Sequence, residues 1–147
     1  MVAYNKIQDF TEQLGLGKHV FGTDVLEVCL TDTAPVATNT ILGNLVPIAY
    51  TNYSDTLTAD RVLEGDAWVE VTGTSTLDAD DFTITAVTGA LPQWQYLALF
   101  NQTQSSPVDP LICWWDNGSA INLALGESIV IDFGADAGTD GDIFTLV

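Results

Sequence analysis

The sequence predicts an all-β protein: an antiparallel β-sandwich, jelly-roll-like, with one N-terminal α-helix. Three observations predict this class. After Gly22, several segments alternate apolar and polar residues with a period of two, as strands with one buried face do. Clusters of Gly, Asn, Asp, Ser and Pro separate these segments at short intervals. The chain has 147 residues, 47% of them hydrophobic, so it can bury a core as one domain, residues 1–147.

A helical period is found only near the N-terminus. Ile7, Phe10 and Leu14 recur at spacings of three and four residues, so they form one apolar stripe. Asn5 is a suitable N-cap. We therefore predict a helix over about residues 5–15, and because it is short it needs a surface to pack on.

The first strand-like segment covers residues 25–31, and one of its sides is richly apolar. A polar loop containing Pro35 follows it. Residues 41–50 are apolar but are interrupted by Gly43 and Pro47, which favours a short helical turn or an irregular crossover.

The rest of the chain reads as strand after strand, and two of these strands are apolar on both faces and therefore central. The predicted strands are residues 67–73, 81–87, 93–102 (central), 110–117 (central), 128–134 and 142–147. Polar stretches between them are predicted turns. These are residues 73–81, 101–110, 116–119 and 134–142.

The charge balance excludes several classes of partner. Three Lys or Arg stand against twenty Asp or Glu, which gives a formal net charge of −17. Such a surface repels nucleic-acid phosphates and anionic lipids, so we expect neither a nucleic-acid nor a membrane partner. The first residues lack the apolar core of a signal peptide, and no apolar run approaches the ~20 residues of a membrane helix. The chain is expected to fold in a cytosol.

The few basic residues are unevenly distributed. Lys6, Lys18 and His19 lie in the first twenty residues, and Arg61 is the last basic residue. The N-terminal end is therefore less negative than the body. Two roles stay open for it: the segment docks on a larger assembly, or the helix covers one open end of the sandwich.

Two adjacent tryptophans stand in one predicted strand. Neighbouring strand residues point to opposite faces, so Trp114 and Trp115 cannot form one continuous sugar platform. One ring is expected in the core, and the other faces a neighbouring element, a partner chain or solvent. A carbohydrate site that adds Asp116 and Asn117 is the alternative, although both residues also suit a turn.

Catalytic and metal-binding patterns are missing from the sequence. His19 is the only histidine, at the predicted helix-to-strand junction, where we expect a surface or capping residue. No Gly-x-Ser-x-Gly elbow, phosphate-binding glycine motif or zinc-type Cys spacing occurs. Cys29 and Cys113 lie in apolar strand-like runs and are expected as buried thiols. We predict no enzyme activity, no catalytic residue, no cofactor and no metal.

Calcium is the alternative that the acidic loops raise. Calcium prefers six to eight oxygen ligands, but neither loop has the spacing of a known calcium loop, so simple turns are favoured. The acidic residues are Asp78, Asp80 and Asp81 in one loop and Asp136, Asp140 and Asp142 in the other.

Two segments carry a resemblance to a known group. The stretches "GTDVLEVCLTDTAPVATNT" (residues 22–40) and "DPLICWWDNGSAINLALGESIVIDF" (residues 109–133) resemble small virion proteins of tailed bacteriophages. Residues 45–80 match only loosely. The matching positions are Asp24, Leu26, Val28, Leu30, Thr31, Ala34 and Pro35, then Trp114, Trp115, Asp116, Gly118, Ser119, Ile121, Leu123, Gly126 and Glu127.

The resemblance implies a capsid decoration, or cement, protein located in the virion. It further implies a homotrimer whose partner is the major capsid protein or another virion protein. A tail, neck or fibre-base component is the alternative in this class, and a carbohydrate-binding adhesin module is the alternative outside it. The chain has fewer basic residues than the group, so a contact made there by Lys or Arg is altered here. Our predicted contact residues are Tyr4, Lys6, Phe10, Lys18, His19 and Trp115.

Overall fold

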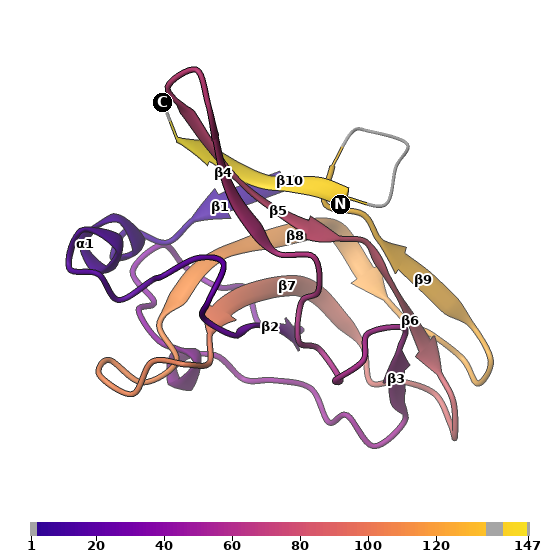
Figure 1. Cartoon of the computed structure of the whole chain (residues 1–147). Helices are drawn as coiled ribbons and strands as arrows, with labels where there is room; N and C mark the ends of the chain where they lie inside the picture. Colours follow the sequence, from indigo (N-terminus) through magenta and orange to yellow (C-terminus); the bar gives the residue numbers. More distant parts are fainter. Residues whose placement is uncertain (1–2, 135–139, 147) are drawn as a thin grey trace.

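The computed structural model describes residues 3–134 and 140–146, and in that part of the chain it places ten strands and one α-helix. The strands pair antiparallel in three sheets, ordered β1-β8-β7-β2, β10-β5-β4 and β3-β6-β9 (Figure 1). The strands are β1 (Ala3–Lys6), β2 (Leu26–Thr31), β3 (Tyr53–Asp55), β4 (Ala67–Val71), β5 (Thr74–Asp80), β6 (Phe82–Ala86), β7 (Trp94–Asn101), β8 (Leu111–Ile121), β9 (Ser128–Ile131) and β10 (Asp140–Leu146).

The all-β class with a single short helix is therefore confirmed. A jelly roll has eight strands in two sheets. The described strands instead form one four-stranded and two three-stranded sheets, so a jelly-roll topology is not established by this pairing.

The N-terminal helix is shorter than predicted. Helix α1 covers Phe10–Gly15, and the preceding residues form β1, in which Asn5 pairs with Trp114. The prediction that Asn5 caps the helix is wrong, because the edge of β8 offers these residues a hydrogen-bonded ladder instead. The apolar stripe still packs as expected: Ile7 and Phe10 are fully buried.

The four-stranded sheet holds the centre of the core, and β2, most of β7 and the first half of β8 are buried. All six residues of β2 are buried, although only one side was predicted to be richly apolar. One face packs against the other sheets. The chain around Leu42, Leu45 and Ile48 packs on the core from outside the sheets. This covering segment contains the 3-10 helix Leu42–Asn44, so the short helical turn, one of the two forms predicted for residues 41–50, is present there.

Strand β5 was not predicted, because its Thr, Ser and Asp residues resemble a turn. In the structure Leu77 and Ala79 alternate into the core, and the outward positions are polar. The turn between β4 and β5 has only two residues, Thr72 and Gly73, with φ of 51° and 86°. Positive φ at both positions is typical of a type I′ turn, whose twist matches that of the strands.

Strand β8 extends beyond its predicted end. The expected turn at residues 116–119 is wrong, since the strand continues to Ile121. The register with β7 shifts there: Tyr96 pairs with Asp116, but Trp94 pairs with Ile121. The additional β8 residues form a bulge, in which Gly118 has φ of 77°. The turn-like residues thus bend a strand instead of ending it.

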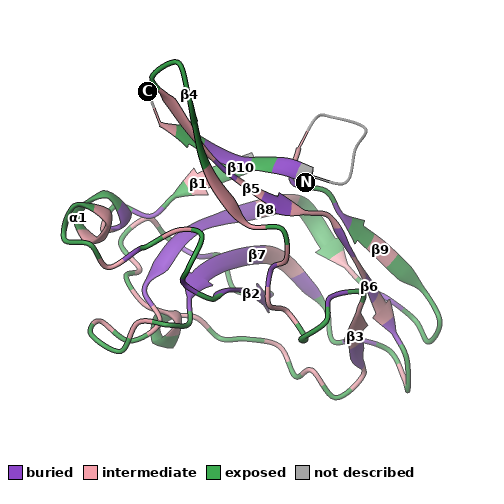
Figure 2. Cartoon of the chain, in the orientation of Figure 1, coloured by how far each residue is buried: buried purple, intermediate pink, exposed green. Residues whose placement is uncertain are grey.

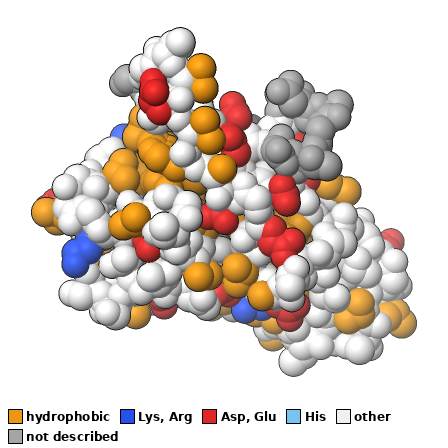
Figure 3. Space-filling model, in the orientation of Figure 1, with side chains coloured by type: hydrophobic (Ala, Val, Ile, Leu, Met, Phe, Trp, Pro, Cys, Tyr) orange, Lys and Arg blue, Asp and Glu red, His pale blue; other side chains and the backbone are white. Residues whose placement is uncertain are grey.

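Buried residues concentrate in β2, β7 and β8, whereas the far end of the β4–β5 hairpin is exposed (Figure 2). This hairpin projects beyond the rest of the molecule in Figure 1 and in the space-filling view of Figure 3. The molecule therefore combines a covered central sheet with one protruding arm.

Candidate functional site: an aromatic cluster and a protruding hairpin

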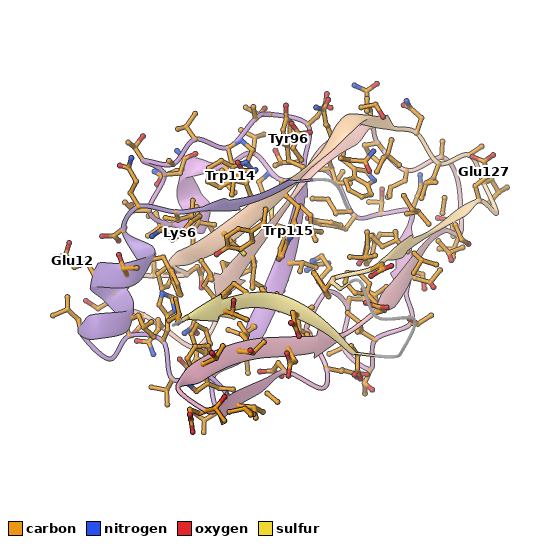
Figure 4. All side chains as sticks on the ribbon, turned by 90° about the horizontal axis from the view of Figure 1, so that it is seen from above. Lys6, Glu12, Tyr96, Trp114, Trp115 and Glu127 are labelled. Carbon is orange, nitrogen blue, oxygen red and sulfur yellow. The ribbon has the colours of Figure 1, made fainter. Side chains whose placement is uncertain are left out.

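The two tryptophans are structural. Trp114 and Trp115 are only 9% and 5% exposed, and they lie on opposite sides of β8 (Figure 4). Trp115 packs on Tyr4 and Phe133, with ring centroids 6.2 Å and 5.3 Å away. The prediction of opposite faces is confirmed, and so is the entry of one ring into the core. The second ring is covered as well, so neither ring offers a sugar-stacking surface.

A cluster of rings joins the N-terminal segment to the base of the hairpin. We call Phe10, His19, Phe21, Trp68 and Phe144 the aromatic cluster. The ring centroids of Phe10 and Phe144 are 5.2 Å apart, and those of Phe21 and Trp68 are 5.3 Å apart. Aromatic pairs at such distances stabilise beyond their buried area. The cluster therefore fixes β4 and β10 against the segment around α1.

His19 lies inside this cluster, so the prediction of a surface or capping residue is wrong. It is 4% exposed, and its ring stacks on Phe21 with an interplanar angle of 4°. Its Nδ1 is 3.3 Å from Asn101 Nδ2, which also donates to Asp24 Oδ2 at 2.6 Å. Its Nε2 is buried without a hydrogen-bond partner among the described residues. Burial lowers the pKa of His19 to about 4, although Asp24 opposes the shift.

The predicted contact residues divide into two groups. Phe10, His19 and Trp115 are buried within the chain, because rings from other segments surround them. Their burial leaves them little surface for contact with a partner. Tyr4 and Lys6 are exposed, and Lys18 is half-buried.

The free edge of β2 is covered by a distant segment, and we call this arrangement the sealed edge. Val28 N–H donates to the Arg61 carbonyl at 2.9 Å, and Leu30 N–H donates to the Tyr50 hydroxyl at 2.9 Å. Ile48 N–H donates to the Leu30 carbonyl at 3.0 Å. Residues 48–61 thus take the place of a neighbouring strand.

Arg61 holds the sealed edge together. Its guanidinium lies 2.9 Å from Glu27 Oε1 and 4.1 Å from the centroid of the Tyr50 ring. Its backbone N–H donates to Asp55 Oδ2 at 2.8 Å. A small cavity of about 110 Å³ lies beside these groups and is also lined by Cys29. The one Arg of the chain therefore acts inside the fold.

No catalytic arrangement is found in the described part of the chain. His19 faces Asn101 and Asp24 and has no nucleophile as a partner. Both cysteines are buried free thiols, as predicted, and burial raises the pKa of Cys29 to about 11, so this thiol stays protonated at neutral pH.

The calcium alternative has no support among the described residues. No group of three or more His, Cys, Asp or Glu there is arranged to hold a metal ion. Asp78 and Asp80 belong to strand β5 and not to a loop, which corrects the predicted turn. Asp136 and the side chain of Asp140 lie outside the described part of the structure. None of the helices described is long and apolar enough to cross a membrane.

Apolar side chains are exposed on the protruding hairpin (Figure 3). Val69 and Val71 of β4 are 44% and 62% exposed. Trp68, between them and the body, packs on Phe21 and Phe144. The Glu70 carboxylate accepts a hydrogen bond from Gly73 N–H across the turn. The exposed valines therefore sit on an anchored, internally braced arm.

No protein-family model, curated protein or solved structure matches this chain. Burial, charge and the shape of the surface are therefore the properties of this chain that indicate its function. The molecule has covered aromatic rings, an acidic body and a protruding hairpin with exposed valines.

Proposed function

We propose that the protein is a non-enzymatic structural component of a bacteriophage virion, a decoration or cement protein on the exterior of the head. One observation carries the proposal: the large rings serve packing, and an anchored hairpin with exposed valines projects from an acidic body. A rigid protruding arm suits contact between proteins, and its ordering costs little on binding. The resemblance of residues 22–40 and 109–133 to small phage virion proteins supports the same class.

The charge supports an exterior position. A formal net charge of −17 repels packaged DNA, so an acidic protein of this kind is compatible with the outside of a shell and not with its inside. The same charge favours partners that present Lys or Arg.

The partner in this proposal is the major capsid protein or another virion protein, and the oligomer is a homotrimer. The trimer follows from the resemblance alone, although closed cyclic symmetry suits a symmetric shell. Of the predicted contact residues, Tyr4, Lys6 and Lys18 stay available at the surface.

A tail, neck or fibre-base position is the alternative within this class. The carbohydrate-binding alternative depended on an exposed tryptophan, and the burial of Trp114 and Trp115 removes that support. No specific observation favours either alternative over the head.

Cryo-electron microscopy of intact virions that contain the chain tests the proposal. We expect density for the chain on the outer surface of the head, in contact with capsid subunits. Density confined to the tail or neck, or absence of the chain from purified particles, contradicts the head assignment.

A charge-reversal variant tests the N-terminal docking hypothesis. Deleting residues 1–16 would also remove β1 and the buried Phe10, so loss of folding would confuse the result. Lys6→Glu combined with Lys18→Glu leaves the core intact. Unchanged binding of this variant to particles refutes docking through these lysines.

A further inference from the structure

Strand β4 leaves one side of its backbone open. It pairs with β5 and ends the sheet ordered β10-β5-β4. Residue pairs alternate along an antiparallel ladder between hydrogen-bonded and non-hydrogen-bonded. The two-residue type I′ turn makes Val71 and Thr74 a hydrogen-bonded pair, and Val69 with Thr76 is the next such pair.

The backbone groups of Trp68 and Glu70 therefore point away from β5. Within residues 3–134 and 140–146, no hydrogen bond reaches the N–H or C=O of either residue from that side. We call these groups the open edge. An unpaired strand edge is a template for another strand.

The open edge has neither Lys, nor Pro, nor a bulge, and Glu70 is its one charged residue. Exposed edges are commonly guarded by Lys, Pro or a bulge. Strand β4 reads Ala-Trp-Val-Glu-Val, and its pairing with β5 is regular over all five residues. Trp68 in the aromatic cluster and the Glu70–Gly73 hydrogen bond hold the strand in an extended conformation before any partner arrives.

Charge identifies the partner. Glu64, Asp66 and Glu70 lie on or just before β4, and Asp142 pairs with Asp78 in the same sheet. A second copy of the chain brings the same negative charge and is repelled. A segment with Lys or Arg is attracted.

We propose that the open edge of β4 binds an extended segment of a partner protein by strand addition, and that this segment alternates basic and aliphatic residues. In such a pair, directly opposed side chains share a face of the sheet. Aliphatic residues then lie opposite Val69 and Val71, and a Lys or Arg lies opposite Glu70. The inference rests on the proposed function, because it names the surface through which the chain meets a virion partner.

Two synthetic peptides test the proposal on the full chain. The probe is TKVKVKT, and the control is TEVEVET, which keeps the strand pattern and reverses the charge. We expect the lysine peptide to slow amide exchange of Trp68 and Glu70 at least about tenfold in NMR spectra of the labelled protein. Raising the salt concentration from about 50 mM to about 500 mM weakens the effect. The glutamate peptide leaves both amides unchanged.

Three variants locate the binding. Glu70→Pro removes the outward N–H and abolishes binding, whereas Glu70→Gln keeps the backbone and weakens it. Val130→Lys alters an exposed valine of another edge strand, β9, and leaves binding unchanged. Circular dichroism confirms that each variant is folded.

Three results overturn the inference. The first is that the lysine peptide does not slow amide exchange at Trp68 and Glu70. This includes the case in which the peptide binds but shifts the NMR signals of acidic residues elsewhere only. The second is that these amides already exchange slowly without peptide, and that their protection increases with protein concentration. A second copy of the chain then occupies the edge. The third is unchanged binding by Glu70→Pro. If any of these results is obtained and the chain is still found on virion heads, only the proposal for the open edge is refuted. The proposed function then stands.

Discussion

Strands β2 and β4 each end a sheet of the same molecule, and the chain treats their edges in opposite ways. The edge of β2 is covered by residues 48–61, with Tyr50 and Arg61 completing its hydrogen bonds. The edge of β4 has no such cover among the described residues, and exposed valines flank it. The fold seals the edge of β2 with a long segment and charged side chains, whereas it leaves the backbone edge of β4 open, where we propose that a partner strand adds.

The largest expected effect comes from breaking the sealed edge at Arg61. Arg61→Ala leaves Glu27, which is buried, without its cation. Removing one partner of such a pair is strongly destabilising, so we expect the free energy of unfolding to fall by about 3 kcal/mol. Urea denaturation followed by tryptophan fluorescence measures it.

The control for this change removes both charges. Arg61→Ala combined with Glu27→Gln recovers at least about 1 kcal/mol of the loss, because no uncompensated charge stays buried. A loss of less than about 1 kcal/mol for Arg61→Ala alone contradicts the role given to this residue.

The next effect is expected from lowering the pH, which acts through His19 at the base of the hairpin. The pKa of His19 is lowered to about 4 in the folded state, below its usual 6.5, so the unfolded chain binds the proton more readily. Stability from this group is complete above pH 6.5 and decreases as the pH falls toward about 4, by about 3 kcal/mol.

An NMR titration measures the pKa of His19 in the folded chain directly. Since His19 is the only histidine, its Hε1 resonance is unambiguous in the NMR spectrum. His19→Gln should show a smaller fall in stability between pH 6.5 and 4 than the wild type. A His19 midpoint near 6.5 is incompatible with the buried neutral ring described above.

A smaller effect is expected at Tyr50. Tyr50→Phe removes the hydroxyl that accepts the Leu30 N–H and keeps the ring under Arg61. An unsatisfied buried N–H costs about 1–2 kcal/mol, and exchange of the Leu30 amide should accelerate correspondingly. Tyr96→Phe, outside the sealed edge, serves as the matched control. If both variants lower the stability equally and change exchange of the Leu30 amide equally, the Tyr50 hydroxyl does not complete the hydrogen bonds of the β2 edge.

The smallest effect on stability is expected at the open edge. Val69→Lys changes an exposed side chain of β4 and should alter the free energy of unfolding by less than about 0.5 kcal/mol. The same variant should lose binding of the lysine peptide through like-charge repulsion. A large loss of stability instead indicates that Val69 packs within the fold.

The parts of the molecule that carry a local sequence pattern were predictable. Strand β6 follows its alternation, with Phe82, Ile84 and Ala86 buried, and β7, which was predicted to be central, is buried at most of its positions. Strand β5 was missed because Thr, Ser and Asp mask its alternation. Strand β1 was missed because its residues precede a helical stripe and pair with a partner more than a hundred residues away.

The site escaped prediction for a related reason. The sealed edge joins Leu30 to Tyr50 and Glu27 to Arg61 across separations of 20 and 34 residues, and no local periodicity encodes such contacts. His19 is buried by rings from separate segments, so its burial could not be predicted from the local sequence either. The solitary Arg61 in a strongly acidic chain is the one sequence signal that could have indicated the sealed edge, and it was not used.

Hydrogen exchange of free and virion-bound protein tests the difference between the two edges most directly. In the free chain we expect slow exchange at Val28 and Leu30 and fast exchange at Trp68 and Glu70. On the particle, protection should appear at Trp68 and Glu70 and leave β2 unchanged. Fast exchange at Trp68 and Glu70 in both states, with new protection elsewhere, would contradict the assignment of the open edge as the contact surface.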